Sequence, residues 1–406
     1  MKSYAHLGRF GALLVLGLAA CEVLLMISPF AGFFYASLQF EPVLGILSNS
    51  PFTAWLDGFF LNHSVVTTSS FLEWQRTFGL YLFALGIWGF LVSAIQVYGN
   101  KIRGRGVATG LLYRFSRHPQ YLCLAIAGWG LLTIWPRLLL LGLWVTMLFL
   151  YAGLARFEEY RMAERFGDSY RAYADRRSAF LPGNPVGRML EAGFGWIKPR
   201  PLRWVAAYAC SLIVVFAAGF ALRAYTGAHV VTLRRPDAVV ISAWPQSEEW
   251  LGKVFDTALG GEGVRERLQT RGTAPVVATV LPPRYVMKGM FYKMPPTSAP
   301  TEGTRPRSSS LAGIVRIAVG FLLPCLRSGS FMGVDPDSGQ DPVEVVFSRA
   351  EKPYREEIPL NEALDASVRL KPFLVVDVQP PRGPVTGVRT PLPQNRWGPR
   401  VVMPLF

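Results

Sequence analysis

The sequence Arg117-His118-Pro119-Gln120-Tyr121-Leu122 opens an apolar segment that runs to Trp135, and a second apolar segment follows from Leu138 to Leu154. Only a Pro-Arg pair separates the two segments. A helix that spans a membrane needs about 20 predominantly apolar residues. We therefore predict that these two short segments form a tight helical hairpin in a membrane, with the Arg-His pair at the start of its first helix.

The composition of the whole chain also indicates a membrane protein. Of its 406 residues, 51% are hydrophobic and 17% are charged, against roughly 25% charged residues in soluble domains. No Lys or Arg occurs between Arg9 and Arg76, and burying a charge in hydrocarbon is costly. The formal net charge is +15, and the Lys and Arg residues that produce it cluster next to the apolar segments. This favours basic loops at an anionic membrane surface, and we expect no nucleic-acid partner.

Five candidate spans predict an all-α polytopic membrane bundle. They run approximately over Phe10–Phe30, Trp74–Tyr98, Tyr121–Trp135, Leu138–Leu154 and Trp204–Leu222. Within the first, Leu18-Ala19-Ala20-Cys21 resembles a lipoprotein cleavage box. Because the apolar run continues to Tyr35, a retained helix is favoured over cleavage before Cys21.

The charges of the loops predict the orientation of the bundle. Five basic residues and no acidic residue lie between Tyr98 and His118, whereas Glu41, Asp57 and Glu73 lie in loops on the other side. Basic loops tend to face the cytoplasm. We therefore expect the candidate site on the cytoplasmic side of the plasma membrane, which is the inner membrane if the host is bacterial, and the C-terminal domain outside.

The sequence changes character after residue 223, so we predict a membrane domain over residues 1–223 and a separate domain over residues 224–406. Prolines interrupt the second domain too often for long helices. Short β-like runs indicate a β-rich extramembrane domain, and they lie at Val239–Ala243, Val276–Leu281, Val343–Phe347 and Leu374–Val378.

Three further segments of this domain have a predicted structure. Trp250–Gln269 predicts one amphipathic helix, and Ser298–Ser310 has the composition of a flexible linker. The apolar stretch Leu311–Leu326 predicts a buried or membrane-surface helix, with a sixth span as the alternative. The domain carries no motif that indicates a chemistry.

The first candidate site lies at the start of the Tyr121–Trp135 segment. Pro119 suits the first turn of a helix and holds His118 in an extended conformation. A helix start offers free backbone N–H groups and a partial positive charge, which suit a carboxylate or phosphate ligand. The alternative is a basic cluster that reaches the lipid headgroups.

The second candidate site follows the Leu138–Leu154 segment. Glu158 and Glu159 lie at the end of a membrane helix, where carboxylates are costly unless they meet a cation. Because Arg117 and His118 lie on the same membrane face, we predict that the two pairs meet.

An aromatic and basic pattern continues beyond these glutamates. Its spacing predicts a stripe on one helix face, formed by Phe166, Tyr170, Tyr173 and Arg177. Taken alone, this stripe suits an amphipathic helix on the membrane surface with tyrosines as interfacial anchors.

Together these stretches resemble the superfamily of isoprenylcysteine carboxyl methyltransferases and phospholipid N-methyltransferases. The resemblance covers about residues 74–182. It rests on a Gly-x-x-Tyr-x-x-x-Arg-His-Pro-x-Tyr block that starts at Gly110, on the hairpin, and on Glu-Glu with a Phe-Gly-x-x-Tyr-x-x-Tyr pattern that starts at Phe166. Cys123 stands where many members carry glycine.

The resemblance implies S-adenosylmethionine as the cofactor and a lipid or small lipophilic acceptor with a carboxylate, amine or thiol group. It implies cofactor binding by Arg117, His118, Pro119, Tyr121, Leu122, Glu158, Glu159, Tyr170 and Tyr173, and catalytic roles for Glu159 and Arg177. Methyl transfer from a sulfonium needs alignment and a dry site, so no metal is expected. Glu159 or His118 could serve as the base if the acceptor arrives protonated.

Two other functions share part of this pattern. Membrane reductases of the steroid-reductase type resemble the Arg-His-Pro block but bind NADPH. The Glu-Glu pair and the tyrosine pattern favour the methyltransferase. A non-enzymatic membrane anchor for residues 224–406 is the other alternative, and an ionisable cluster at membrane depth argues against it as the whole function.

Overall fold

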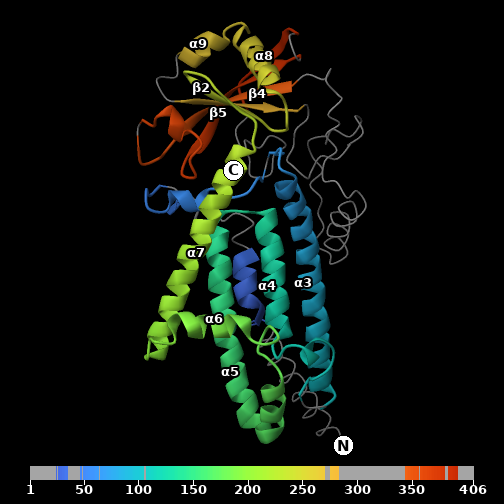
Figure 1. Cartoon of the computed structure of the whole chain (residues 1–406). Coiled ribbons are helices and arrows are strands. Elements are labelled where there is room, and N and C mark those ends of the chain that lie inside the picture. Colours follow the sequence, from blue (N-terminus) through green and yellow to red (C-terminus); the bar gives the residue numbers. More distant parts are fainter. Residues whose placement is uncertain are drawn as a thin grey trace, which may run out of the picture. The chain divides into compact units, whose positions relative to one another are not determined.

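The computed structural model describes residues 24, 26–34, 46–47, 49–63, 65–104, 107–269, 275–282, 343–355, 357–379 and 383–391. The chain divides into two compact units, drawn together in Figure 1. The membrane unit comprises Met1–Gly45 and Phe78–Leu222, and the sheet unit comprises Ile46–Thr77 and Arg223–Phe406. The predicted linker Ser298–Ser310 and the segment Leu311–Leu326 lie outside the described residues.

Four of the five predicted spans coincide with apolar helices of the described chain, labelled in Figure 1. These are α3 (Ser70–Ile102), α4 (Pro119–Ile134), α5 (Leu138–Arg176) and α7 (Arg200–Ala228). Three of them, α3, α5 and α7, are long and apolar enough to cross a membrane, whereas α4 is shorter. The remaining predicted span, Phe10–Phe30, is described only at residues 24 and 26–30, which are helical.

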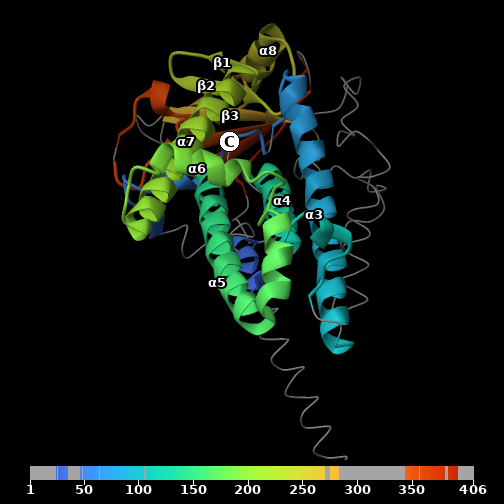
Figure 2. The ribbon, with the colours of Figure 1, turned by 60° about the horizontal axis from the view of Figure 1, so that its bottom comes forward.

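The predicted hairpin is confirmed: α4 ends at Ile134, α5 begins at Leu138, and the two helices lie side by side in Figures 1 and 2. Glycines allow close packing of α4 on α3 as well. A Cβ on Gly86 of α3 would lie 2.5 Å from the backbone nitrogen of Ala127 in α4. Small residues that let helix backbones approach each other are typical of membrane bundles.

Helix α5 contains a sharp break at Gly167, where φ is 54° and ψ is −131°. An L-residue with a Cβ rarely adopts these angles, whereas glycine does so readily. Figure 2 shows that the chain turns back after this break. The prediction of one continuous helical stripe is therefore wrong, because Phe166 precedes the break while Tyr170 and Tyr173 follow it.

Two short elements complete the described part of the membrane unit. A 3-10 helix, η2 (Leu111–Arg114), precedes α4. Helix α6 (Pro185–Phe194) lies between α5 and α7, and its Asn184 cap accepts a hydrogen bond from the backbone nitrogen of Gly187 at 3.3 Å.

The sheet unit contains a six-stranded mixed sheet whose strands follow the order of the sequence. Strands β2 and β3 pair in parallel, and the other neighbours pair antiparallel. The strands are β1 (Thr232–Arg234), β2 (Ala238–Ser242), β3 (Val276–Leu281), β4 (Val343–Glu351), β5 (Arg369–Val378) and β6 (Val385–Arg389). The β-rich prediction is confirmed, since each of the four predicted runs lies largely or wholly within a strand.

The connection from β2 to β3 carries two helices, α8 (Glu248–Leu259) and α9 (Val264–Gln269). The prediction of a single helix over Trp250–Gln269 is therefore wrong. Glycines explain the division: α8 is capped by Gly260, and Gly263 has a φ of +70°. Such a backbone conformation does not occur inside an α-helix.

Both faces of the sheet are covered, which explains the nearly continuous apolar runs in its strands. Helix α8 packs on one face through residues such as Leu251 and Phe255. The other face packs against Phe59 and Val65, which precede α3, and against Ile358 and Ala363. A 3-10 helix, η1 (Ala54–Asp57), lies just before Phe59, and another, η3 (Leu360–Glu362), follows Ile358.

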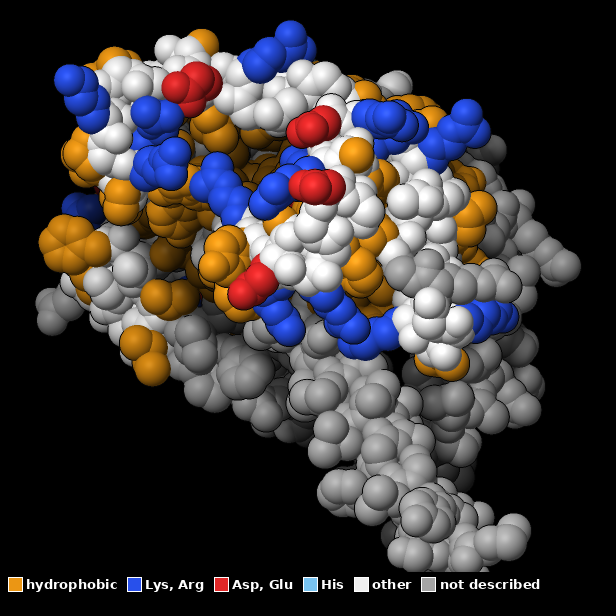
Figure 3. Space-filling model, turned by 90° about the horizontal axis from the view of Figure 1, so that it is seen from below, with side chains coloured by type: hydrophobic (Ala, Val, Ile, Leu, Met, Phe, Trp, Pro, Cys, Tyr) orange, Lys and Arg blue, Asp and Glu red, His pale blue; other side chains and the backbone are white. Residues whose placement is uncertain are grey.

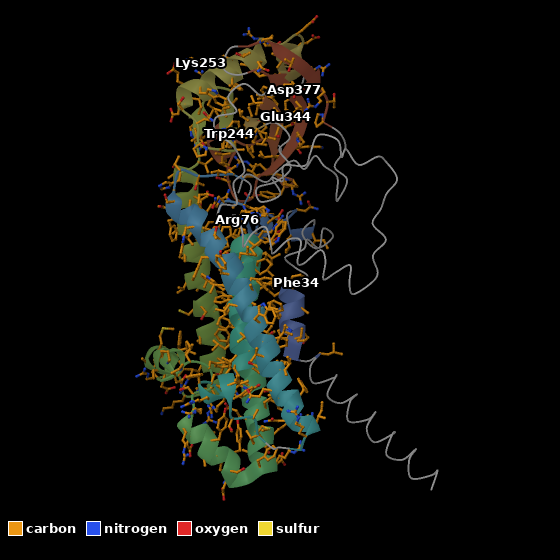
Figure 4. The ribbon with its side chains drawn as sticks, turned by 90° about the vertical axis from the view of Figure 1, so that its right-hand side faces the viewer. Phe34, Arg76, Trp244, Lys253, Glu344 and Asp377 are labelled. Atoms are coloured by element: carbon orange, nitrogen blue, oxygen red, sulfur yellow. The ribbon has the colours of Figure 1, made fainter. Side chains whose placement is uncertain are left out.

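Ion pairs connect β4, β5 and β6 of this sheet. Figure 4 labels Glu344 of β4 and Asp377 of β5, which are register partners. The guanidinium of Arg389 on β6 pairs with both carboxylates, with 2.8 Å between Nη2 and Glu344 Oε1. These ion pairs link three adjacent strands.

Candidate active site at the start of helix α4

The start of α4 is joined to the segment that follows α5. His118 is the N-cap of α4 and Pro119 its first residue. The backbone nitrogens of Arg117 and His118 donate to the carbonyl oxygens of Ser178 and Ala179, each at 3.0 Å. These bonds are possible because the chain reverses at Gly167 and brings residues 178–179 back beside the Arg-His-Pro block.

Four side chains meet at this junction. Arg117 Nη2 lies 3.1 Å from Glu159 Oε1, and His118 Nε2 lies 3.0 Å from the same oxygen. His118 Nδ1 lies 3.4 Å from Glu158 Oε2. Two adjacent basic residues thus meet two adjacent carboxylates. We call Arg117, His118, Glu158 and Glu159 the charged cluster.

The charged cluster is only partly open to solvent. The His118 side chain is 7% exposed and that of Glu159 is 25% exposed, whereas Glu158 is 45% exposed. Burial lowers the pKa of His118, but hydrogen bonds and charge attraction from Glu158 and Glu159 raise it more, so the net pKa lies above its ordinary value of 6.5. The carboxylates therefore favour the protonated imidazole.

Aromatic side chains enclose the cluster on the side of the hairpin. The Tyr121 hydroxyl donates a hydrogen bond to Glu158. Its ring stacks on that of His118 at 5.8 Å between centroids and on that of Tyr151 at 4.8 Å. The sequence motifs did not single out Tyr151. A signal was available, because Tyr151 lies seven residues before Glu158 and therefore on the same face of α5.

The two predicted tyrosines beyond the break pack beside the cluster. The Tyr173 hydroxyl donates to the carbonyl oxygen of Tyr113 at 2.9 Å. Tyr170 is buried, and its ring centroid lies 6.2 Å from that of Tyr173. Both are brought to the Arg-His-Pro block by the reversal at Gly167 rather than by helical spacing.

The remaining predicted residues have other surroundings. Pro119 is buried at the first position of α4, and the backbone nitrogen of Leu122 donates to the carbonyl oxygen of His118 at 3.2 Å. The guanidinium of Arg177 donates to the carbonyl oxygen of Arg176 at 3.3 Å, in an exposed position. The structure thus brings together most of the predicted residues but leaves Arg177 at the edge.

The charged cluster lies at the basic end of an apolar helical hairpin, which is the arrangement of a membrane protein with a polar site at one end of its helices. Residues 74–169 match the family described as phospholipid methyltransferase. This part of the chain is therefore similar to the superfamily of isoprenylcysteine and phospholipid methyltransferases, as the motifs predict, and the match supports methyl transfer at a membrane in general terms.

A curated relative shares part of the same region. Methanethiol S-methyltransferase 1 from Bradyrhizobium diazoefficiens is 39% identical over 103 residues, which are 23% of this chain and 35% of that relative. The chain thus spans about a third of the length of the curated relative that it matches. No solved structure matches the chain.

Proposed function

We propose that this protein transfers a methyl group from S-adenosylmethionine to a lipid or a small membrane-associated acceptor. The observation that carries this proposal is the charged cluster, in which Arg117 and His118 meet Glu159 within 3.1 Å. The cluster lies within the segment that matches the phospholipid methyltransferase family.

The residues of the site fit the polar groups of S-adenosylmethionine, which carries a carboxylate, an ammonium group and ribose hydroxyls. Arg117 Nε and Gln120 Nε2 are buried donors without a hydrogen-bond partner among the described residues. Buried donors without partners are costly, so a bound acceptor group would relieve them. Glu158, 45% exposed, is available to an ammonium or hydroxyl group.

The side chains of the site would orient the donor and exclude water. S-adenosylmethionine supplies an electrophilic methyl group that needs no further activation. Arg117, His118 and Tyr121 would hold the polar end of the donor at the start of α4, with Tyr170 and Tyr173 beside it. Alignment and a dry site are the contributions that such a displacement requires from a protein.

Glu159 is the glutamate that both cations of the cluster contact most closely. Glu159 Oε1 is shared by Arg117 and His118, and two donors on one oxygen stabilise the charged carboxylate. We therefore assign Glu159 a binding and positioning role. Arg177, which lies within electrostatic reach of Tyr173, would add positive potential at the edge of the site.

The acceptor class has two leading candidates within this proposal. The family description refers to phospholipids, which suggests a lipid amine. The name of the relative refers to methanethiol, which suggests a small thiol. A thiol reacts as its thiolate, so this acceptor would need a weaker base than an alcohol.

A methyl-transfer assay on membranes tests the proposal. Membranes from expressing and non-expressing cells are incubated with methyl-labelled S-adenosylmethionine, with and without methanethiol. Label is then measured in the organic extract and in the headspace. We expect labelled product in the organic extract or in the headspace, and only in samples with membranes from the expressing cells. A lack of transfer to either fraction, combined with binding of NADPH by the solubilised protein, would contradict the proposal in favour of a reductase.

Matched variants connect the activity to the cluster. Arg117→Gln and Glu159→Gln should each abolish most of the transfer. Arg171→Gln is the control, because Arg171 belongs to the same region but forms only an exposed ion pair with Asp168 at 3.2 Å. Equal activity in all three variants would contradict the assignment of the site.

A further inference from the structure

A second candidate site, formed by residues other than those of the charged cluster, lies where α6 meets α5 and the start of α7. A cavity of about 410 Å³ occupies this place. The residues of its wall that matter here are Arg156, Glu191, Phe194, Arg200, Arg203 and Trp204. Apart from Arg156, they lie outside the segment that matches the methyltransferase family. Its volume lies in the range of about 300–1,000 Å³ that is usual for small-molecule sites.

The wall of this cavity carries more positive than negative charge. Glu191 is the one acidic side chain among the described residues of the wall, and it is occupied by Arg203, with 2.8 Å between Glu191 Oε2 and Arg203 Nη1. The other donors of Arg203 bind the carbonyl oxygens of Ile197 at 3.1 Å and Gly195 at 3.0 Å. Arg203 therefore has a structural role, and Glu191, which pairs with Arg203, does not neutralise the other two arginines.

Arg156 and Arg200 are the cations that remain for a ligand. Neither takes part in an ion pair among the described residues of the chain. The guanidinium of Arg156 lies over the ring of Trp204, 4.0 Å from its centroid, and such stacking holds a guanidinium plane in place. Arg200 is the first residue of α7, where the helix dipole adds partial positive charge. Glu159 is within electrostatic reach of Arg156, but its Oε1 already binds Arg117 and His118.

The surroundings of the cavity indicate a membrane surface. Val186 and Met189 of α6 and the following Trp196 are 51%, 67% and 78% exposed. A short helix with an exposed apolar face and a nearby tryptophan is typical of the lipid–water interface. Since α7 can cross a membrane and begins at Arg200, its first turn would lie at the level of the headgroups.

The molecular surface agrees with this location. Figure 3 shows the end of the molecule that includes the reversal of α5, and lysine and arginine side chains gather there around hollows lined by hydrophobic side chains. Basic side chains next to exposed apolar ones match the chemistry of anionic lipids, which offer both phosphate and acyl chains.

We propose that this cavity binds the phosphate headgroup of an anionic membrane phospholipid. Arg156 and Arg200 bind the phosphate oxygens, for which the planar guanidinium is suited because it donates two parallel hydrogen bonds. The acyl chains lie against the exposed apolar side chains of α6. This proposal does not depend on methyl transfer, because it concerns lipid binding at a separate place.

Native mass spectrometry of the full-length, delipidated protein in detergent tests this site. The protein is titrated with phosphatidylglycerol, with phosphatidylcholine, and with inorganic phosphate as a competitor. We expect the first bound phosphatidylglycerol to bind at least tenfold more tightly than phosphatidylcholine. The double variant Arg156→Gln/Arg200→Gln should lose this preference, whereas millimolar phosphate should displace the lipid only weakly.

A matched double variant separates the site from general charge effects. Arg161→Gln/Arg171→Gln removes two cations from the same helix outside the cavity, so it should keep the preference for phosphatidylglycerol. Arg156→Lys/Arg200→Lys keeps both charges and should lose only part of the affinity for phosphatidylglycerol. Such a partial loss would show that misfolding does not explain the effect of the glutamine variant. Equal loss in both glutamine double variants would overturn the proposal. Displacement of the lipid by phosphate at equal concentration would also overturn it, because the cavity would then be a site for free anions.

Discussion

Arg117 Nη2 and Glu159 Oε1 lie 3.1 Å apart, although all of α4 and the first half of α5 separate the two residues in the sequence. His118 Nε2 binds the same oxygen at 3.0 Å. Because the hairpin returns the chain to the membrane face from which it started, the two basic residues and the two glutamates form one cluster.

The first prediction concerns the shared carboxylate. Glu159→Gln removes the negative charge that holds Arg117 and His118 in place, and a donor bound by these two cations should lose about 2 kcal/mol of binding free energy. This corresponds to roughly a 30-fold loss of affinity for S-adenosylmethionine, measured by equilibrium binding to solubilised protein. The exposed Glu164→Gln of the same helix is the control and should bind normally. Unchanged affinity in Glu159→Gln would remove Glu159 from the binding site.

The second prediction concerns pH. Glu158 and Glu159 raise the pKa of His118 above 6.5 in the folded protein, in spite of burial. The stability that protonated His118 contributes is therefore full below about pH 6.5 and is lost as the pH rises through the folded-state pKa. The Tm in detergent should fall over this range, and the fall should be smaller in His118→Asn. A fall of equal size in that variant would assign the titration to another group.

The third prediction concerns the reversal of α5. Gly167→Ala forces an alanine into a backbone conformation that costs about 1–3 kcal/mol, although nothing lies within 4 Å of the added Cβ. We expect a lower Tm and a loss of activity, because Tyr170 and Tyr173 depend on the reversal. Gly153→Ala is the matched control: its position in α5 is helical and equally open, so the substitution should be neutral or slightly stabilising.

The fourth prediction concerns the contact of α3 with α4. A Cβ on Gly86 would lie 2.5 Å from the nitrogen of Ala127 and 2.6 Å from the carbonyl oxygen of Cys123. Backbone atoms cannot move aside cheaply, so Gly86→Ala should destabilise the protein by about 1–3 kcal/mol. Gly99→Ala of the same helix has no close neighbour and should keep its Tm. Equal Tm values for the two variants would contradict this packing.

The fifth prediction concerns the sheet unit. Arg223 donates to the carbonyl oxygens of Phe59 at 2.5 Å and Leu364 at 2.6 Å, and so joins two segments that cover one face of the sheet. Arg223→Met leaves both carbonyl groups without this donor, at a cost of about 1.5–3 kcal/mol for each bond to a charged group. Hydrogen exchange should increase in residues 54–63 and 360–366. The exposed Arg234→Gln should not change exchange there.

The sequence was sufficient to predict most of the secondary structure. The segments Trp74–Tyr98 and Leu138–Leu154 are helical because long, predominantly apolar runs satisfy their backbone groups internally as helices. The strands β2 and β3 were equally clear, because strands buried on both faces are continuous runs of β-branched residues. The pair Trp135-Pro136 marked the hairpin turn, since proline rarely continues a helix.

The sequence also indicated which charges must meet. Carboxylates such as Glu158 and Glu159 at the end of a membrane helix require cations, and Arg117 and His118 were available on the same face. The pairing of individual atoms, such as Glu159 Oε1 with both cations, could not be predicted, because it depends on how α4 and α5 pack.

Other features were decided only by the tertiary structure. The break at Gly167 separates Phe166 from Tyr170. The spacing of these residues in the sequence is nevertheless that of a continuous helix, so the pattern gave no sign of the break. Ile46–Thr77 belongs to the sheet unit, although it lies between apolar segments of the membrane unit. Local periodicity reports which face of a segment is buried, whereas backbone reversals and contacts between distant segments depend on the packing of the whole chain. That difference is the physical reason why the elements and the meeting of opposite charges were predictable, whereas the backbone reversal and the atomic geometry of the site were not.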